Sequence, residues 1–564
     1  MKQDKQEQEA RKMGIYLNSK KPYDNYKETA SSTYYVDKSM MLEELIPLVE
    51  PLDGITGQNE KVRSNKYICI TRPRRFGKTV MANMIAAYFG KGQDSLEIFR
   101  DLKIYSNKHF SAHLNQHDII FINFHELPRD CRTYRQYIDR IQNRMLQDLR
   151  KAYPDAEIDP EGAVWDALNN IYEWKERIRF IFVMDEWDFI FHRKFVTDED
   201  KIAYIDFLSG LLKDQPYVEL AYMTGILPIA EYSSGSESNM FCEYTMINEE
   251  KFSEFFGFTE TEVDKIYEKY LMLYKMPKVT RTGLRQWYDG YETGSGERVY
   301  NPRSVILSLS NNHLGSYWTS AGPYDEIFYY IEQNVDSVRD DLAHMVSGIP
   351  VPARNCEYAA TSMNLTTKDE IFSAMIVYGF LSYSEGFVRI PNRELMGKFD
   401  AMIRKEPSLG YVFRLAHVSE EMLRATLEGD TGKMCRILEY AHHTESPLLK
   451  YNSEAELTIL ITLLYLAARD RYFMERESKA GTGYADFLFV PMNPKADALI
   501  LELKVDDTAE HAVQQIKNRQ YTLRFMPETG GQIQYTGKIL AVGIAYNKKT
   551  KKHECKVEVI RGAL

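Results

Sequence analysis

Cysteine is scarce in this chain, which contains only six among its 564 residues. The six are scattered, and no two of them form a Cys-x-x-Cys pair, so a zinc site built on such pairs is excluded. We therefore expect reduced thiols in a cytoplasmic protein, at positions 69, 131, 242, 356, 435 and 555.

Long apolar runs are also missing. The most apolar stretch, Leu457 to Ala468, is bounded by Glu456 and Arg469, and at about a dozen residues it is too short to span a bilayer. The N-terminal segment MKQDKQEQEARKM is charged and lacks the apolar core of a secretory signal. No membrane segment and no membrane partner are expected.

The chain has no excess of positive charge. Lys and Arg number 71 against 81 for Asp and Glu, which gives a net charge of −10 at pH 7. Any contact with nucleic acid must therefore come from a local patch. The hydrophobic share of 44% and the charged share of 27% are ordinary for globular proteins. The length predicts about three to five domains, and we find no internal repeat and no low-complexity tract.

Residues 66–225 alternate between short apolar runs and longer helix-like segments. This alternation is typical of an α/β domain with a mostly parallel sheet, because continuous apolar runs suit strands that are covered on both faces. The predicted strands are 66–71, 118–124, 179–185 and 218–224.

The middle and C-terminal parts have different patterns. The middle is predicted to be mainly helical, with Thr259 and Glu262 forming a capping box and with aromatic, turn-rich loops at WYDGYETGSG and YNPRS. The C-terminal part predicts helices over 454–470 and 508–521 and strands over 484–490, 498–504 and 538–546. We therefore expect an α/β multidomain protein whose parts are 1–245, 246–449 and 450–564.

The segment ICITRPRRFGKTVMANMIAAYF predicts a phosphate site, because it places Gly77, Lys78 and Thr79 at the start of a helix that follows a strand. Backbone N–H groups at a helix N-terminus bind anions, Lys78 would reach the β- and γ-phosphates, and the Thr79 hydroxyl would ligate Mg²⁺. The pattern G-x-x-x-x-G-K-[ST] is not fully met, since Arg72 stands at the first glycine position.

Acidic and hydroxyl side chains at two later strand ends support this site. Asp185 ends a buried strand and is expected to hold Mg²⁺ through water, and Glu186 is expected to polarise the attacking water. Thr224, at the end of another strand, is predicted to contact the γ-phosphate or the water. The alternative is a chance helix start beside an ordinary strand end. Arg74 and Arg75 are candidates either for phosphate contacts or for an arginine that acts on a neighbouring subunit, and the alternative is that they are solvated loop charges.

A second constellation lies in the C-terminal part. Asp486 lies on one predicted strand, and Glu502 and Lys504 share a face of the next, because side chains alternate along a strand. Two carboxylates from adjacent strands suit Mg²⁺ or Mn²⁺, and a lysine beside them can activate a water for phosphodiester hydrolysis. Gln515 and Tyr521 on the following helix are candidates to position the phosphate or the water.

Three further acidic residues lie near this second site in the sequence. Glu454 or Glu456, and Glu477, are possible additional carboxylates. The alternative interpretation is that short charged patterns of this kind are common on solvated strand faces. Residues 453–564 hold 16 basic and 14 acidic residues, a balance of +2 that leaves −12 for the rest, which weakly favours a DNA-facing domain. The lysines at 548, 549, 551 and 552 are interpreted as a solvated turn rather than a DNA contact.

At these residues the chain resembles a bacterial family in which an AAA-ATPase-like domain is joined to a C-terminal PD-(D/E)XK nuclease-like domain. The resemblance covers nearly the whole chain and rests on YYVDKS, RPRRFGKT, VMDEWD, YMTGILPI, SESNMFCEYTM, FFGFTETEV, WYDGY, VYNPRSV, SYWTSAG, GTGYAD, LILELK and AEHAVQQIKNRQY. It implies that Arg72 at the glycine position is normal. One departure is Tyr484, which stands where the family commonly has arginine.

The resemblance implies a P-loop ATPase domain, a mainly helical middle region and a restriction-endonuclease-like α/β domain. We expect ATP and Mg²⁺ as cofactors, with Mn²⁺ as an alternative at the nuclease site, and DNA as the partner. The alternatives are a nucleotide-dependent sensor that binds DNA or another partner without cutting it, and a structural module in which neither site turns over. A homo-oligomer is compatible with the sequence.

Overall fold

A computed structural model of the chain describes residues 13–49, 66–174, 177–229, 240–318, 331–332, 334–354, 365–444, 454–480, 483–525 and 535–561. Cys356 and the side chain of Glu454 lie outside the described parts. The other five cysteines are free thiols, as expected. No helix in these ranges is both long and apolar enough to cross a membrane.

The chain divides into two compact units. Unit 1 comprises Met1–Tyr324, Ala353–Gly386 and Pro391–Glu394, and unit 2 comprises the remaining segments up to Leu564. The region 246–449 is therefore shared between the two units, and the division into 1–245, 246–449 and 450–564 stays a prediction.

Unit 1 contains a five-stranded parallel sheet, which confirms the predicted fold class. Its strand order is β2-β3-β4-β1-β5 and every neighbouring pair is parallel. The strands are β1 (Tyr67–Thr71), β2 (Asp118–Asn123), β3 (Phe180–Asp185), β4 (Val218–Gly225) and β5 (Cys242–Tyr244).

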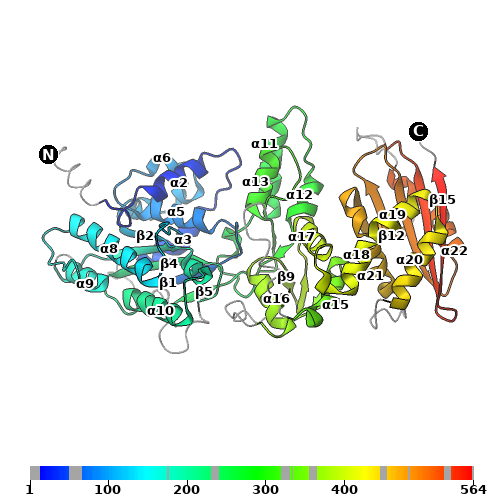
Figure 1. Cartoon of the computed structure of the whole chain (residues 1–564). Coiled ribbons are helices and arrows are strands. Elements are labelled where there is room, and N and C mark those ends of the chain that lie inside the picture. The colour runs from blue at the N-terminus through cyan, green and yellow to red at the C-terminus, as the bar shows by residue number, and fades with distance from the viewer. Residues whose placement is uncertain are drawn as a thin grey trace. The chain divides into compact units, whose positions relative to one another are not determined.

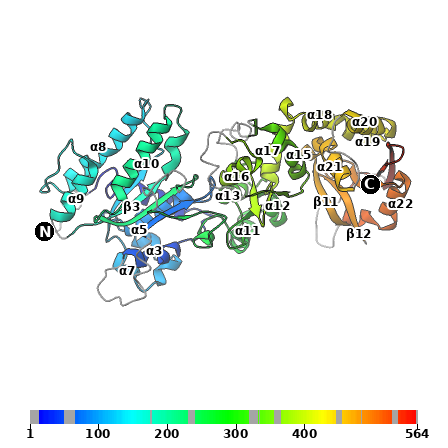
Figure 2. The same cartoon turned by 90° about the horizontal axis from the view of Figure 1, so that it is seen from below.

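Helices cover both faces of this sheet, which explains why its strands are continuous apolar runs. One face carries α2 (Lys21–Ala30), α3 (Met41–Val49) and α5 (Lys78–Phe89), and the short α6 (Leu96–Phe99) and α7 (Phe110–His113) lie on the same side. The other face carries α8 (Tyr134–Ala152), α9 (Val164–Trp174) and α10 (Asp198–Leu212) (Figures 1 and 2). Because the strands are parallel, their carboxyl ends meet at one edge.

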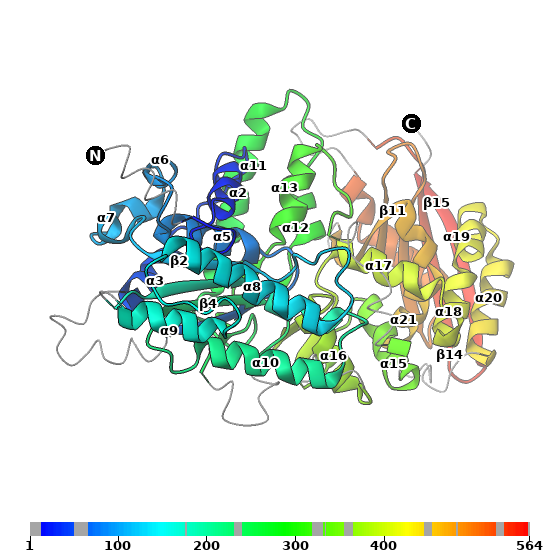
Figure 3. The ribbon, with the colours of Figure 1, turned by 60° about the vertical axis from the view of Figure 1, so that its left-hand side comes forward.

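The rest of unit 1 is built from short helices and hairpins. It contains α11 (Glu260–Leu273), α12 (Arg281–Tyr288), β6 (Tyr291–Glu292), β7 (Arg298–Val299), α13 (Pro302–Ser310), α16 (Lys368–Val377) and β9 (Ser382–Ser384). Helices α11, α12 and α13 lie side by side (Figure 3), around a core that includes Tyr270, Leu284 and Val305.

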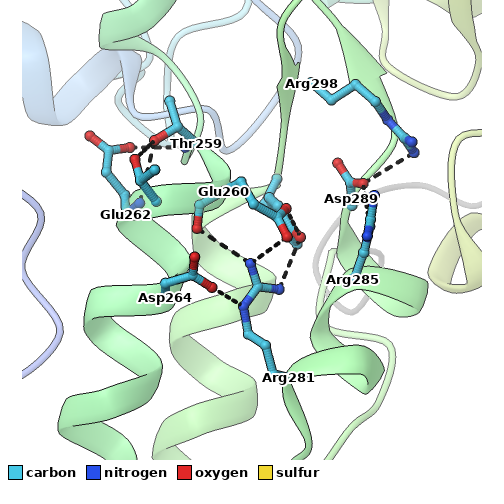
Figure 4. Close-up of polar contacts among 10 residues, drawn as sticks. Thr259, Glu260, Glu262, Asp264, Arg281, Arg285, Asp289 and Arg298 are labelled. Carbon is cyan, nitrogen blue, oxygen red and sulfur yellow. Dashed lines mark hydrogen bonds and ion pairs between the residues drawn. The ribbon is translucent and has the colours of Figure 1, made fainter.

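Polar contacts fix the start of α11, join α11 to α12 and hold the turn that follows α12 (Figure 4). The predicted capping box of α11 is confirmed: the Thr259 hydroxyl accepts from the Glu262 backbone N–H, and Glu262 accepts from the Thr259 N–H at 2.9 Å. Glu262 also pairs with Lys38 at 2.7 Å, which links the YYVDKS segment to α11. Asp289 of WYDGY is buried and pairs with Arg298 at 3.1 Å.

Unit 2 contains a second five-stranded sheet, of order β11-β12-β13-β14-β15. The pair β13 and β14 is parallel, and the other pairs are antiparallel. The strands are β11 (Tyr472–Ala480), β12 (Gly483–Pro491), β13 (Ala498–Val505), β14 (Ile539–Asn547) and β15 (Lys552–Arg561).

Helix α22 (Ala509–Asn518) packs on β13, β14 and β15 through Val513 and Ile516. The other helices of unit 2 are α15 (Val335–Val346), α18 (Tyr411–His417), α19 (Ser419–Glu428), α20 (Thr431–Thr444) and α21 (Glu454–Leu464), and the small strands are β8 (Val351–Pro352) and β10 (Phe387–Arg389). Helix α17 (Arg393–Ile403) begins in unit 1 and continues in unit 2. The predicted mixture of a parallel sheet, a helical middle and a C-terminal α/β part is confirmed.

Two candidate functional sites

The loop between β1 and α5 has the backbone of a phosphate site. Gly77, at the N-cap of α5, has φ of +94°, and no heavy atom lies within 4 Å of where its Cβ would be. The left-handed conformation explains the glycine, since other residues adopt it at a steric cost. It turns the chain into α5, whose first N–H groups have no partner in the helix and are available to an anion.

Lys78 folds over this loop. Its Nζ donates to the carbonyl oxygens of Arg72 at 2.7 Å and Pro73 at 2.9 Å. Burial lowers the pKa of Lys78 to about 8, although the carboxylates of Asp188 and Asp185 act in the opposite direction. A buried ammonium group with only neutral hydrogen-bond partners is suited to receive the negative charge of a phosphate.

The acidic end of β3 lies at the same sheet edge. Asp185 is fully buried, its Oδ1 accepts from the Thr224 hydroxyl at 2.7 Å, and Thr79 also donates to its carboxylate. Burial raises the pKa of Asp185, and these two hydroxyl donors and the nearby Lys78 oppose the rise. A carboxylate beside two hydroxyl oxygens fits a hydrated Mg²⁺, so the predicted residues Thr79, Asp185 and Thr224 are brought together.

Glu186 follows in an unusual backbone conformation. Its φ is +55°, in the left-handed region that non-glycine residues rarely adopt. Burial raises the pKa of Glu186, as does the neighbouring Asp185, while His125 and Lys78 oppose the rise. A carboxylate with a raised pKa at the sheet edge is a suitable base for a water molecule.

The arginines of the loop have distinct environments. Arg72 is 2% exposed, donates to the carbonyl oxygens of Thr71 and Tyr244, and has its guanidinium 5.0 Å from the ring centroid of Phe256. Arg75 is directed to backbone carbonyl groups at Tyr317 and Trp318. The backbone carbonyl of Arg74 accepts from the Trp318 indole at 3.1 Å. The predicted phosphate contacts of Arg74 and Arg75 therefore stay predictions.

Two residues of this site were missed by the sequence analysis. Asp188 is 3% exposed and accepts from the backbone N–H groups of Ile226 and Leu227, each at 3.0 Å, which fixes the chain after β4. Asn123, at the end of β2, donates to Asp185 at 3.4 Å. Asn123 ends an apolar run, and Asp188 follows one closely. A polar residue at the end of a predicted parallel strand could have identified both as site residues from the sequence.

The second site lies where β12 and β13 begin to separate. These strands pair antiparallel, and the last paired residues at this end are Phe487 and Leu501. The next position in the same register places Asp486 opposite Glu502. Beyond the last pair, Asp486 Oδ2 accepts from the Leu503 N–H at 2.7 Å. The strand geometry therefore brings the two predicted carboxylates together.

Glu502 is buried and incompletely paired. It is 1% exposed, its Oε2 accepts from the Gln515 amide at 2.8 Å, and its Oε1 has no hydrogen-bond partner. Burial, followed by the charge of Asp486, raises the pKa of Glu502 to about 8, and Lys504 opposes the rise. A divalent cation between Asp486 and Glu502 would offset two unfavourable features of Glu502. It would ligate the Oε1 atom that has no hydrogen-bond partner, and it would favour the ionised form of the buried carboxyl group.

Lys504 and Tyr521 complete the group that the sequence predicted. Lys504 Nζ lies 3.8 Å from Glu502 Oε2, on the same face of β13. The Tyr521 hydroxyl donates to the Tyr484 carbonyl oxygen at 2.7 Å and also contacts Glu502. Tyr484 itself is 62% exposed.

Arg519 was not among the predicted site residues. Its Nη1 donates to the Tyr521 hydroxyl at 3.3 Å, and its charge acts on Glu502 and Asp486. In the described parts of the chain, no group of three or more His, Cys, Asp or Glu side chains is arranged to hold a metal ion. A cation here would thus have two carboxylates and would complete its shell with water or phosphate oxygens, as Mg²⁺ commonly does.

Comparison with known proteins gives matches at both sites. Residues 23–233 match the family model described as "Predicted AAA-ATPase", which includes the loop, Asp185 and Thr224. Residues 453–555 match the PD-(D/E)XK nuclease superfamily, which includes Asp486 and Glu502. These two ranges fall inside the predicted first and third parts.

More distant similarities were also found. An "uncharacterized protein in vnfD 5′ region" of Azotobacter chroococcum mcd 1 is 24% identical over 294 residues, and the chain spans about half, 51%, of the length of that relative. A Walker-type ATPase of Pyrococcus abyssi is 10% identical with a TM-score of 0.33, covering 62% of this chain and 99% of that one. The ORC2 protein of Aeropyrum pernix is 10% identical with a TM-score of 0.29, covering 65% and 92%. From the two family matches and the sites within them, the chain joins an AAA-ATPase-like domain to a C-terminal domain of the PD-(D/E)XK nuclease superfamily.

Proposed function

We propose that the protein is a cytoplasmic ATPase whose C-terminal domain cuts DNA phosphodiester bonds with Mg²⁺. One observation supports each half. In unit 1, Lys78, Thr79 and Asp185 meet at the carboxyl edge of a parallel sheet. In unit 2, a buried glutamate oxygen without a partner lies beside a second carboxylate.

At the nucleotide site, each residue has a separate task. The N–H groups of the first turn of α5 would bind the phosphates, and the Lys78 ammonium would leave the carbonyl oxygens of Arg72 and Pro73 for the β- and γ-phosphates. Thr79 and Asp185 would hold Mg²⁺, which supplies charge neutralisation at the transferred phosphoryl group. Glu186 would accept a proton from the attacking water, and Thr224 would orient Asp185.

At the nuclease site, Asp486 and Glu502 would hold the metal ion, which supplies Lewis-acid stabilisation of the phosphate. Gln515 fixes the Glu502 carboxyl group by a hydrogen bond, and the Tyr521 hydroxyl lies beside that group. Lys504 would orient the water that attacks the phosphorus. Manganese would serve as well, because oxygen ligands of this kind accept either ion.

A second candidate function is a nucleotide-dependent sensor that binds DNA without cutting it. The specific observation in its favour is that the described residues provide two carboxylates and no third metal-binding side chain at this site. The two candidates differ in whether purified protein cleaves DNA when Mg²⁺ or Mn²⁺ is present.

The decisive experiment measures ATP hydrolysis and the cutting of plasmid and linear DNA in parallel. We expect Glu186→Gln to lose ATP hydrolysis by at least about 100-fold, because removing a general base typically costs 10²–10⁴-fold. We expect Asp486→Asn to lose DNA cutting by a similar factor, because it removes a metal ligand.

The matched controls are Glu199→Gln and Asp497→Asn, which remove carboxylates that lie in the same domains away from both sites. Both controls should retain wild-type rates. Wild-type protein that binds DNA but leaves it intact under every combination of nucleotide and metal would favour the sensor.

A further inference from the structure

The phosphate-binding loop, residues 72–77, is enclosed by segments from elsewhere in unit 1. The Gly257 N–H donates to the Phe76 carbonyl oxygen at 3.3 Å, and the Phe76 ring meets Tyr291 edge-on with centroids 5.0 Å apart. Gly379 lies so close that a Cβ on it would be 2.6 Å from the Pro73 Cβ. The loop conformation is therefore set by its surroundings as well as by its own sequence.

Arg75 makes the most direct of these contacts. Its Nη1 donates to the Tyr317 carbonyl oxygen at 2.7 Å and also to the Trp318 carbonyl oxygen. In return, the Trp318 indole donates to the Arg74 carbonyl oxygen at 3.1 Å. Arg75 has a φ of +72°, which is disfavoured for a residue with a side chain. The two-way hydrogen bonding to residues 317–318 stabilises this conformation.

Glu394 contacts the N–H groups of the same two residues, Tyr317 and Trp318. It is 2% exposed, and its Oε1 accepts from the N–H groups of Tyr317 and of Trp318, the latter at 2.6 Å. Burial raises the pKa of Glu394, and the hydrogen bonds from residues 317 and 318 and the charge of Arg75 oppose the rise. The N–H groups of residues 317–318 thus face a carboxylate while their carbonyl groups face a guanidinium.

This arrangement aligns the peptide dipoles between two opposite charges, which strengthens both sets of hydrogen bonds in a buried setting. We call Glu394, the peptide groups of Tyr317 and Trp318, and Arg75 the loop clamp. The hydrogen bonds that the described residues give to the two charged ends go to residues 317 and 318, not to the N–H groups of α5 or to Lys78. The clamp therefore acts on the phosphate-binding loop through its backbone.

We propose that Glu394 is a positioning residue for the nucleotide site, which acts through the peptide groups of residues 317–318 to fix Arg75 and the phosphate-binding loop in the conformation that binds phosphate. This inference rests on the proposed binding of nucleotide and extends it. It gives Arg75 the role of a loop anchor. It also explains why a carboxylate that is distant in the sequence is buried beside the loop.

The test compares the full-length wild-type protein with Glu394→Gln, Arg75→Lys and the control Glu297→Gln. Glutamine keeps the size and an acceptor oxygen but removes the negative charge, and Lys cannot donate to two carbonyl groups with the same geometry. Glu297 is an exposed carboxylate in the same unit. The affinity for a non-hydrolysable ATP analogue with Mg²⁺ is measured by calorimetry.

We expect the dissociation constant to rise about tenfold in Glu394→Gln and in Arg75→Lys, as loss of a charge-assisted hydrogen bond does, and to stay unchanged in Glu297→Gln. A second readout is the fluorescence of Trp318, taken as the difference from Trp318→Phe. Acrylamide should quench it more strongly in Glu394→Gln, at an unchanged midpoint of thermal unfolding. If Glu394 were needed only for overall folding, its substitution would lower the midpoint of thermal unfolding. The dissociation constant and the quenching of Trp318 in the folded protein would then stay unchanged.

The outcomes separate the two proposals. Wild-type protein that does not bind the ATP analogue overturns the proposed function and the clamp together. Binding by the wild type and equally tight binding by folded Glu394→Gln overturns the clamp alone. If Glu394→Gln does not fold, Arg75→Lys decides, because wild-type affinity in that variant overturns the clamp.

Discussion

Lys78 illustrates how burial prepares a single residue for its ligand. Its ammonium group is largely buried and donates to the carbonyl oxygens of Arg72 and Pro73. The folded protein therefore carries a positive charge at a position where that charge is poorly solvated. Phosphate oxygens would supply the missing stabilisation. The free energy lost when folding desolvates the ammonium group would then be recovered when the nucleotide binds.

This leads to a prediction about pH. The pKa of Lys78 is about 8. In the absence of nucleotide, Lys78 is therefore neutral in about half of the protein molecules at pH 8 and in most of them at pH 9. Bound phosphates raise that pKa, so the complex holds more protons than the free protein. Binding then takes up protons near pH 8, and nucleotide affinity falls as the pH rises from about 7 to 9.

Calorimetry in two buffers of different ionisation enthalpy measures this proton uptake directly. About half a proton per bound nucleotide should be taken up at pH 8, because Lys78 is neutral in half of the free protein molecules at its pKa. Lys78→Arg serves as the control, because arginine stays protonated over this range. Identical binding enthalpies in the two buffers for the wild type would contradict the prediction.

Among elements, the sequence predicted all the central strands of the two large sheets but only one of their four edge strands, β2, whose run DIIFIN is apolar. β1, β2, β3, β4, β12, β13 and β14 lie within a residue or two of the predicted runs. β5, β11 and β15 were missed, and each lies at an edge of its sheet. These missed edge strands carry charged or half-exposed residues, as in KHECKVEVIR, so they lack the apolar run on which the prediction depends.

The site residues divide in the same way. Lys78, Asp185, Glu502 and Gln515 could be predicted because each lies at a fixed place on a recognisable strand or helix. The contact between Arg75 and residue 317 joins positions 242 apart in the sequence. No local pattern encodes such a contact, because it depends on how separate elements pack together.

Helix α22 carries a prediction about DNA. Gln515 lies within it and reaches Glu502, and Arg519, just beyond its C-terminal end, is exposed beside Tyr521 and the two carboxylates. We expect Arg519 to contact a DNA phosphate next to the metal. Arg519→Ala should weaken DNA binding and lower the slope of log K against log salt by about 0.9, the value for one phosphate contact.

The measurement is a fluorescence-anisotropy titration of DNA at several salt concentrations, in an Asp486→Asn background that prevents cutting. Lys517→Ala is the matched control, since it removes a positive charge from the same helix where Lys517 is already paired with Glu558. The salt slope of that control should stay close to the starting value. A slope unchanged by Arg519→Ala would show that the arginine faces no phosphate.

For the whole molecule, the question is whether the two sites influence each other. Helix α17 provides a covalent path, because Glu394 in its first turn belongs to unit 1 and the residues from Leu395 onward belong to unit 2. Glu394 contacts the peptide groups that Arg75 also contacts. Asp400, later in the same helix, pairs with Arg469 at 2.5 Å, just before β11.

Helix α17 therefore carries both a member of the loop clamp, in unit 1, and a residue that is paired next to the strands of unit 2. We predict that a non-hydrolysable ATP analogue changes the DNA affinity of the Asp486→Asn protein by about 5- to 150-fold, the usual range of coupling between sites. Linkage then requires that DNA change the affinity for the analogue by the same factor, because both measurements close one thermodynamic cycle. Lys78→Ala should abolish both effects, and DNA affinity that is identical with and without the analogue would show that the two domains act independently.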